Sequence, residues 1–125
     1  MNFEFDEETR MFQSMVRDFV ANEIAPCASE WDTTSEFPHD VFTKMAGLGL
    51  YGVGLPEEFG GMGDEITFTI AAEEVSRGSG GLGISYLVSL GLAMYPVTMH
   101  GTHEQKALYI PRVIEGATVA FALTE

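Results

Sequence analysis

The chain has 125 residues, of which 46% are hydrophobic and 20% are charged, which suits a single domain with a packed core and some apolar surface to spare. With 19 acidic and 6 basic residues, its formal net charge is −13. Such a surface repels phosphate backbones and anionic lipid headgroups, so we expect no nucleic-acid partner.

The first predicted element is a long amphipathic helix over residues 6–31. Asp6 can cap its start, and apolar residues recur at three- and four-residue steps. Pro26 lies inside this pattern, so we expect the helix to kink or to end near Ala25. The stripe consists of Phe12, Met15, Val16, Phe19, Val20 and Ile24.

A second helix is predicted from Pro38 to Gly47, and a glycine-rich turn follows over residues 50–61. Residues 47–52 spell G-x-G-x-x-G, the pattern of dinucleotide-binding turns. That pattern must follow a strand and open a helix, whereas here it follows a helix. We therefore interpret it as a helix end and a tight turn.

A third helix is predicted over residues 65–77, with Glu73 and Arg77 spaced as an ion pair on its surface. Its apolar positions are expected to face inward. They are Ile66, Ile70, Ala71 and Val75.

Residues 78–99 contain no charged side chain, and this stretch is long enough to cross a bilayer. Its five glycines, its hydroxyl side chains and Pro96 make it only modestly hydrophobic, and its flanks show no positive bias. We therefore interpret residues 82–99 as a buried central helix disturbed at Pro96, and we expect no membrane span.

A fifth helix is predicted after Thr102, which forms a capping-box pattern with Gln105. Pro111 is expected to interrupt this helix, and Gly116 to end it. Residues 118–123 form an apolar, strand-like run. The predicted fold is all-α, a bundle of about five helices that ends in one short strand-like segment.

The sequence shows no convincing metal or catalytic set. Glu36 and His39 spell E-x-x-H only once, whereas di-iron bundles need two such pairs. No serine, histidine and aspartate stand at a suggestive turn. The single cysteine, Cys27, excludes an intrachain disulfide and a multi-cysteine zinc site. We predict no metal site and no catalytic residue.

Localisation is predicted from the same cysteine and from the acidic N-terminus. The first residues lack the hydrophobic run of a signal peptide, and one cysteine is natural for a reducing environment. We expect a cytoplasmic protein, or one in another reducing soluble compartment.

Five motifs in chain order resemble the N-terminal helical domain of the flavin-dependent acyl-CoA dehydrogenases. The resemblance covers essentially the whole chain, and it identifies residues 1–125 as that domain. It implies a fragment of a larger enzyme that lacks the middle β-domain and the C-terminal helical domain. The motifs are Arg17-Asp18-Phe19 with Glu23-Ile24-Ala25-Pro26, Phe37-Pro38 with 48–50 and 55–61, Glu73-Glu74 with Arg77, 101–106 with 109–111 and Gly116, and 122–125.

The resemblance also implies an activity, the α,β-dehydrogenation of an acyl-CoA thioester. In the family, a glutamate removes the α-proton while the β-hydrogen leaves as hydride to FAD, and an electron-transfer flavoprotein collects the electrons. That glutamate belongs to the C-terminal domain, so this fragment is expected to be inactive alone. The rest of the family's flavin motif, which normally follows the closing stretch, is not in the chain, so we also expect the fragment to be without bound FAD. We further expect the full-length protein to form a homo-oligomer.

Few site residues of the family fall in this chain. The resemblance implies that Leu123 and Thr124 contact FAD, with Phe121 as a neighbour of its ring system. By a looser match, Ser89 and Leu90 line the acyl pocket. Plain core packing is the alternative interpretation of those two residues.

An alternative hypothesis treats the chain as a short interaction subunit that completes a site with a partner chain. The surplus of apolar residues supports it. A stop codon directly after Glu125 would favour this hypothesis over a fragment of a larger enzyme, and an unrelated structural bundle is a third option.

Overall fold

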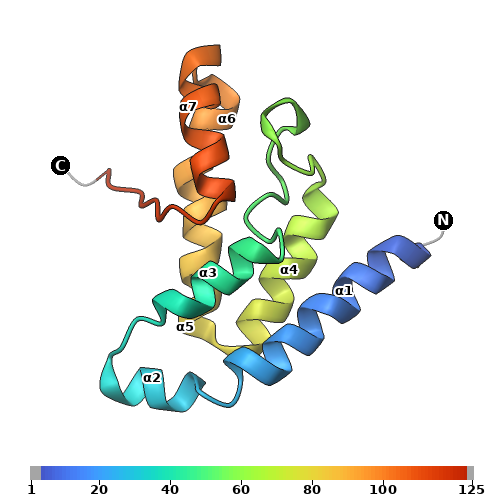
Figure 1. Ribbon diagram of the computed structural model, residues 1–125, viewed down its shortest axis with the longest axis vertical. Coiled ribbons are helices and arrows are strands. Elements are labelled where there is room, and N and C mark those ends of the chain that lie inside the picture. The colour runs from blue at the N-terminus through green and yellow to red at the C-terminus, as the bar shows by residue number, and fades with distance from the viewer. Residues whose placement is uncertain (1–3, 124–125) are drawn as a thin grey trace.

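The computed structural model describes residues 4–123, which fold into helices joined by short turns (Figure 1). The all-α class is confirmed. The elements are α1 (Glu7–Phe19), the π-helix η1 (Val20–Ile24), α2 (Ala28–Thr34), α3 (His39–Gly47), the 3-10 turn η2 (Glu57–Phe59), α4 (Glu65–Gly78), α5 (Gly80–Leu87), the π-helix η3 (Val88–Met94), α6 (Tyr95–His100) and α7 (His103–Ile114).

The strand-like ending does not form a strand within the described residues. Residues 118–123 are extended; the segment first crosses the helical column formed by α5, η3 and α6 and then leaves the bundle, as Figure 1 shows near the C-terminus. A strand is stable only when a neighbouring strand pairs with its backbone, and residues 4–123 offer none. The apolar run therefore belongs to a segment that finds no pairing strand among residues 4–123.

The first helix ends where the sequence predicts it. Asp6 accepts a hydrogen bond from the backbone N–H of Thr9 at 2.8 Å, which confirms the cap. The helix runs through η1 to Ile24, and the chain turns at Pro26 before α2 begins. The pattern over residues 6–31 is therefore divided near Ala25, as expected, and the buried side of the first part consists of Val16, Val20 and Ile24.

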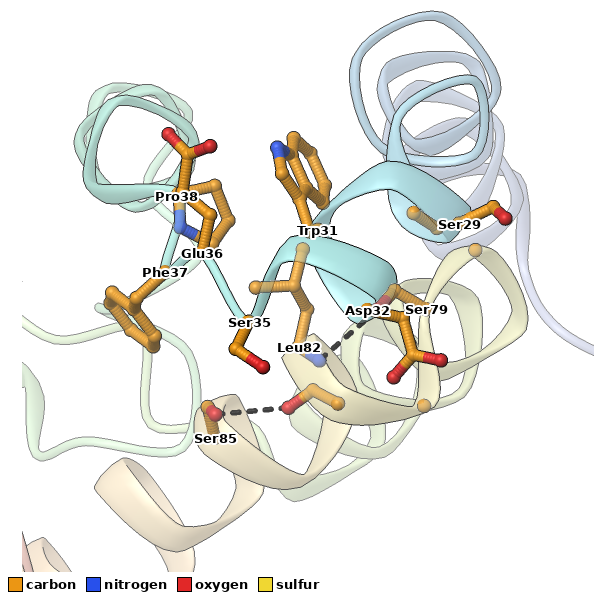
Figure 2. Close-up of a pocket in the computed structure, with 14 residues that line it drawn as sticks. Ser29, Trp31, Asp32, Ser35, Glu36, Phe37, Pro38, Ser79, Leu82 and Ser85 are labelled. Atoms are coloured by element: carbon orange, nitrogen blue, oxygen red, sulfur yellow. Dashed lines mark hydrogen bonds between the residues drawn. The ribbon is translucent and has the colours of Figure 1, made fainter.

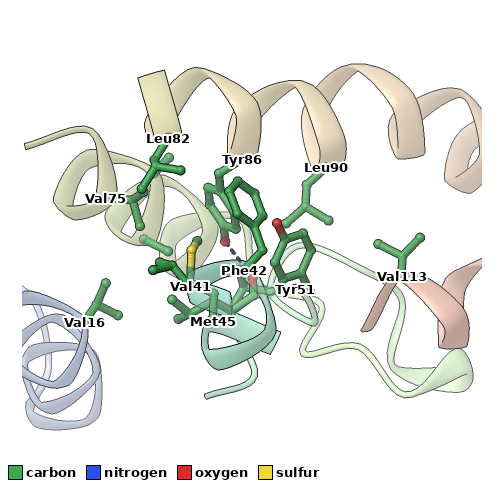
Figure 3. Packing of buried hydrophobic residues seen from close by; sticks show 14 of the residues in the cluster. Val16, Val41, Phe42, Met45, Tyr51, Val75, Leu82, Tyr86, Leu90 and Val113 are labelled. Atoms are coloured by element: carbon green, nitrogen blue, oxygen red, sulfur yellow. Dashed lines mark hydrogen bonds between the residues drawn. The ribbon is translucent and has the colours of Figure 1, made fainter. Parts of the chain in front are cut away.

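The core lies where α3, α4 and α5 meet the turn after α3 (Figure 3). Met45, Leu50, Val75 and Tyr86 are fully buried there. The predicted inward position Ile66 is wrong, because its side chain is 57% exposed at the first turn of α4. Burial begins one turn later, at Ile70, where α4 meets the rest of the bundle.

A hydrogen bond from Tyr86 connects the helical column to the turn after α3. Its hydroxyl donates a hydrogen bond of 2.6 Å to the backbone carbonyl of Leu50, and both residues are fully buried. Tyr86→Phe would leave that carbonyl without its partner. We expect the free energy of unfolding to fall by about 1–2 kcal/mol, measured by urea denaturation of both proteins. Equal stability of the two proteins would contradict this role.

A buried carboxylate connects α4 to α1. Glu74 is fully buried, and its two oxygens accept hydrogen bonds from Arg17 at 3.1 and 2.6 Å and from Gln13 at 3.1 Å. Arg77 Nε lies 3.4 Å away. The hydrogen bonds from Arg17 hold the pKa of the Glu74 carboxyl below its usual value. The predicted pair of Glu73 and Arg77 is also present, at 3.3 Å on the surface.

The uncharged stretch forms one continuous helical column from α5 through η3 to α6. Within residues 4–123, Gly80–His100 is the one helical stretch long and apolar enough to cross a membrane by length and composition, a test that core helices also pass. The expected burial holds for one side only, since Tyr86 and Leu90 are buried while Leu92 and Met99 are exposed. Its irregularity is the π-helix η3, which precedes Pro96.

The start of α7 confirms the predicted capping box. The backbone N–H of Thr102 donates to Gln105 Oε1 at 2.8 Å, and the backbone N–H of Gln105 donates to Thr102 Oγ1 at 3.2 Å. The expected interruption at Pro111 is wrong, because α7 continues to Ile114. Ile110 and Val113 are buried on either side of the proline, and their packing outweighs the missing N–H.

Candidate functional site

A hollow of about 280 Å³ opens between α3, the α5–η3 column and the extended segment after α7. None of the side chains that line it is charged. We call it the aromatic hollow, and its lining residues are Phe37, Phe42, Tyr51, Ile84, Ser85, Val88, Ser89, Thr118, Val119 and Ala120. An apolar hollow with a few polar groups is typical of sites for small organic ligands.

One wall of the aromatic hollow is a ladder of rings. Phe37 stacks on Phe42 with ring centroids 4.7 Å apart, and Phe42 lies 6.2 Å from Tyr51. Tyr51 in turn meets Tyr86 edge to face at 5.7 Å. Because the ladder ends on the buried ring of Tyr86, this wall is anchored in the core.

Ser89 joins the hollow to the extended segment. It is almost fully buried in η3, and its hydroxyl lies 2.9 Å from the carbonyl oxygen of Ser85 and 3.4 Å from that of Val119. The single hydroxyl proton is shared between these acceptors. This contact holds the first part of the extended segment against the column.

Leu90 does not line the aromatic hollow. It is a core residue, 5% exposed, and it lines a separate hollow of about 260 Å³ with Phe68 and Tyr95. Successive helical positions lie about 100° apart, so neighbours in sequence face different sides. The structure thus places Ser89 in the aromatic hollow and Leu90 outside it.

The residues expected to bind a cofactor lie beyond the hollow. Phe121 and Leu123 are 43% and 76% exposed on the extended segment, while Thr124 lies outside the described residues. Within residues 4–123, the backbone groups of 120–123 make no backbone hydrogen bond. Exposed amides beside apolar side chains fit a flat ligand with polar edges, as FAD has.

A larger hollow of about 740 Å³ lies between α2 and the start of α5 (Figure 2). Figure 2 shows the carboxylates of Asp32 and Glu36 and several hydroxyls around it, and no lining side chain is cationic. Ser79 there caps α5 by accepting from the Leu82 N–H at 3.3 Å. Such an acidic rim repels a phosphate-bearing ligand.

No group of three or more histidine, cysteine, aspartate or glutamate side chains in residues 4–123 is arranged to hold a metal ion. Sequence reasoning missed the ring wall of the hollow. Phe42 and Tyr51 carry no motif, and only their apolar character indicated burial.

Comparison with known proteins shows which proteins this domain resembles. A protein of Bacillus subtilis (strain 168) named as the probable acyl-CoA dehydrogenase YngJ is 43% identical over the whole chain, which covers 33% of that protein. The chain therefore spans about a third of the length of this relative.

Solved structures agree with the sequence match. A glutaryl-coenzyme A dehydrogenase in complex with glutaryl-CoA matches with a TM-score of 0.84 and 33% identity, over 92% of this chain and 30% of that one. An acyl-CoA dehydrogenase complexed with FAD from Bacillus anthracis matches with a TM-score of 0.78 and 29% identity, over 90% and 20%. A chain in a structure reported for the electron transferring flavoprotein of Acidaminococcus fermentans matches with a TM-score of 0.86 and 33% identity, over 93% and 31%.

The fold and the hollow define a helical domain whose apolar site stands beside an extended, unpaired segment. The family model described as "Acyl-CoA dehydrogenase, N-terminal domain" matches residues 6–117. The chain belongs to the acyl-CoA dehydrogenase family, and it comprises the N-terminal domain of that family.

Proposed function

We propose that this domain acts within an FAD-dependent acyl-CoA dehydrogenase, and that the aromatic hollow is its share of the acyl site. The contact between Ser89 and the Val119 carbonyl carries the proposal. It brings the uncharged hollow next to the segment that bears Phe121 and Leu123, so an acyl group in the hollow lies beside the expected flavin contacts. In this proposal Leu90, a core residue outside the aromatic hollow, supports the wall of the hollow from the core.

In the proposed reaction, the residues of this chain bind the acyl group and FAD, and they keep water out of the hollow. The rings of Phe42 and Tyr51 offer apolar surface to the acyl group, while Phe121, Leu123 and Thr124 would hold one edge of FAD. FAD, when bound, accepts the hydride that leaves the β-carbon. A dry hollow favours this step because it keeps water from the reacting carbons.

The remaining features belong to the full-length protein. We propose that an electron-transfer flavoprotein is its redox partner, which the match to a chain in the Acidaminococcus structure supports. We also propose a homo-oligomer in a reducing soluble compartment, with the isolated domain inactive and free of FAD.

The test uses the full-length protein loaded with FAD. Anaerobic addition of butyryl-CoA, isovaleryl-CoA or octanoyl-CoA is expected to bleach the visible flavin absorbance, because substrate hydrogen reduces the ring. Val88→Phe would occupy part of the hollow, and we expect it to lower kcat/KM at least about tenfold.

Leu92→Phe serves as the matched control, since Leu92 lies in the same π-helix but does not line the hollow. It should keep kcat/KM within a factor of about two. A flavin that no acyl-CoA bleaches would overturn the proposed activity, and equal effects of the two substitutions would overturn the assignment of the hollow.

A further inference from the structure

The two buried tyrosines of the core, Tyr51 and Tyr86, differ in the hydrogen bonding of their hydroxyls. The Tyr86 hydroxyl donates to the Leu50 carbonyl at 2.6 Å. Tyr51 is only 3% exposed, and among residues 4–123 its hydroxyl has no hydrogen-bond partner. The hydroxyl oxygen itself is not fully buried, because no fully buried side-chain oxygen or nitrogen of the described residues lacks a partner. Such a hydroxyl can be hydrated while the hollow is open, but it needs a new partner when a ligand displaces the water.

The Tyr51 hydroxyl faces the aromatic hollow. Tyr51 lines this hollow, and Figure 3 shows its oxygen pointing toward the helical column that carries Tyr86 and Leu90. Burial raises the pKa of Tyr51 above its ordinary value of 10.0, so the hydroxyl keeps its proton at neutral pH. It is therefore a hydrogen-bond donor to whatever fills the hollow.

Other polar groups of the hollow are already engaged. The Ser85 hydroxyl donates to the Gly81 carbonyl at 2.9 Å, and the Ser89 hydroxyl is shared between two carbonyls. Thr118 is exposed on the extended segment. The Tyr51 hydroxyl is thus a donor on the wall of the hollow that remains available to a ligand.

We propose that Tyr51 is a specificity-determining residue, and that its hydroxyl donates a hydrogen bond to a neutral oxygen in the acyl portion of the substrate. This inference rests on the proposed function. An aliphatic chain would displace water from the hydroxyl and leave it unpaired, whereas a keto or hydroxyl oxygen would satisfy it. Sites that pair a buried polar group discriminate strongly against analogues that lack the matching atom.

The oxygen is expected to be neutral because no charged side chain lines the hollow. A carboxylate there would lose its hydration without gaining a counter-charge, which is costly. The proposed substrate class is therefore an acyl-CoA thioester whose acyl group carries a keto, hydroxyl or ether oxygen.

The test compares isosteric substrates on the full-length, FAD-loaded protein. The pairs are 4-oxopentanoyl-CoA with 4-methylpentanoyl-CoA, and 5-oxohexanoyl-CoA with 5-methylhexanoyl-CoA. The wild type should favour the keto member of at least one pair by about tenfold or more in kcat/KM. In Tyr51→Phe this preference should fall to about one, with an unchanged melting temperature, since the lost oxygen has no protein partner.

Tyr86→Phe is the matched control. It removes a hydroxyl from the neighbouring ring that already has a partner, so it should lower the melting temperature and keep the keto preference. A wild type without preference in either pair, or a preference that survives in Tyr51→Phe, would overturn the inference alone. Failure of every acyl-CoA to bleach the flavin would overturn the proposed function and the inference together.

Discussion

Gly83→Ala is expected to lower the free energy of unfolding by about 2–3 kcal/mol, because two helices touch at this glycine. Gly83 lies in α5, where the column passes α4. A Cβ atom added to it would lie 2.7 Å from both the Cα and the Cβ of Ser76. Backbone atoms of a packed helix cannot move aside cheaply, so the two helices must separate.

The matched control is Gly80→Ala, three residues earlier in the same helix. A Cβ atom there would meet nothing within 4 Å. Alanine favours helix over glycine, so this change should be neutral or stabilise by up to about 1 kcal/mol. Urea denaturation of the three proteins measures the difference, and similar effects of the two substitutions would contradict the close approach of α4 and α5.

Glu74→Gln is expected to cost about 2–3 kcal/mol at neutral pH. The carboxylate accepts charged hydrogen bonds from Arg17, and an amide of the same size can neither balance that charge nor accept through both atoms. The side chains of Arg17 and Arg77 are half exposed, so they can regain water. This access to solvent keeps the cost below that of stranding a buried charge.

The pH dependence of this effect has a definite sign. The pKa of Glu74 is lower in the folded protein than its ordinary value of 4.5, so the folded state favours the ionised form. The contribution of the carboxylate is therefore present above pH 4.5 and is lost as the pH falls through the folded pKa. Wild type and Glu74→Gln should differ by a constant amount above about pH 5.5 and converge in acid.

Glu73→Gln is the control on the same helix. Glu73 pairs with Arg77 at 3.3 Å on the surface, and such exposed pairs contribute little. We expect a change within about 0.5 kcal/mol. A difference between wild type and Glu74→Gln that does not shrink below pH 4.5 would contradict the role of the charge.

Local signals predicted the helix boundaries well. Asp6, Pro26 and the pair of Thr102 and Gln105 act through neighbouring backbone atoms, so the sequence contains all that determines them. The burial of Glu74 depends on Arg17, which is 57 residues away in sequence. An argument from helical periodicity assigns glutamate to the surface. It gives no information on which side chain of another helix pairs with that glutamate.

Prediction of the site was limited for a similar reason. The resemblance placed Ser89 in the acyl pocket, and the structure puts it in the aromatic hollow. The same looser match included Leu90, which the structure places in a separate hollow. Tyr51 follows a glycine-rich turn and looks like any core aromatic, because an unpartnered hydroxyl is visible only once every neighbour has a position.

The π-helix η3 suggests how this hollow could be reshaped during evolution. A π-turn accommodates one residue more than an α-turn, so deleting one residue from Val88–Met94 can restore regular α-helix without breaking the chain. The residues beyond the deletion, from Tyr95 to His100, would keep their orientation relative to α5, because the wide turn absorbs the extra residue without changing the phase of the helix that follows. Loss of a single codon would thus change the side chains that η3 presents to the hollow, where Val88 and Ser89 now lie, and leave α6 in place.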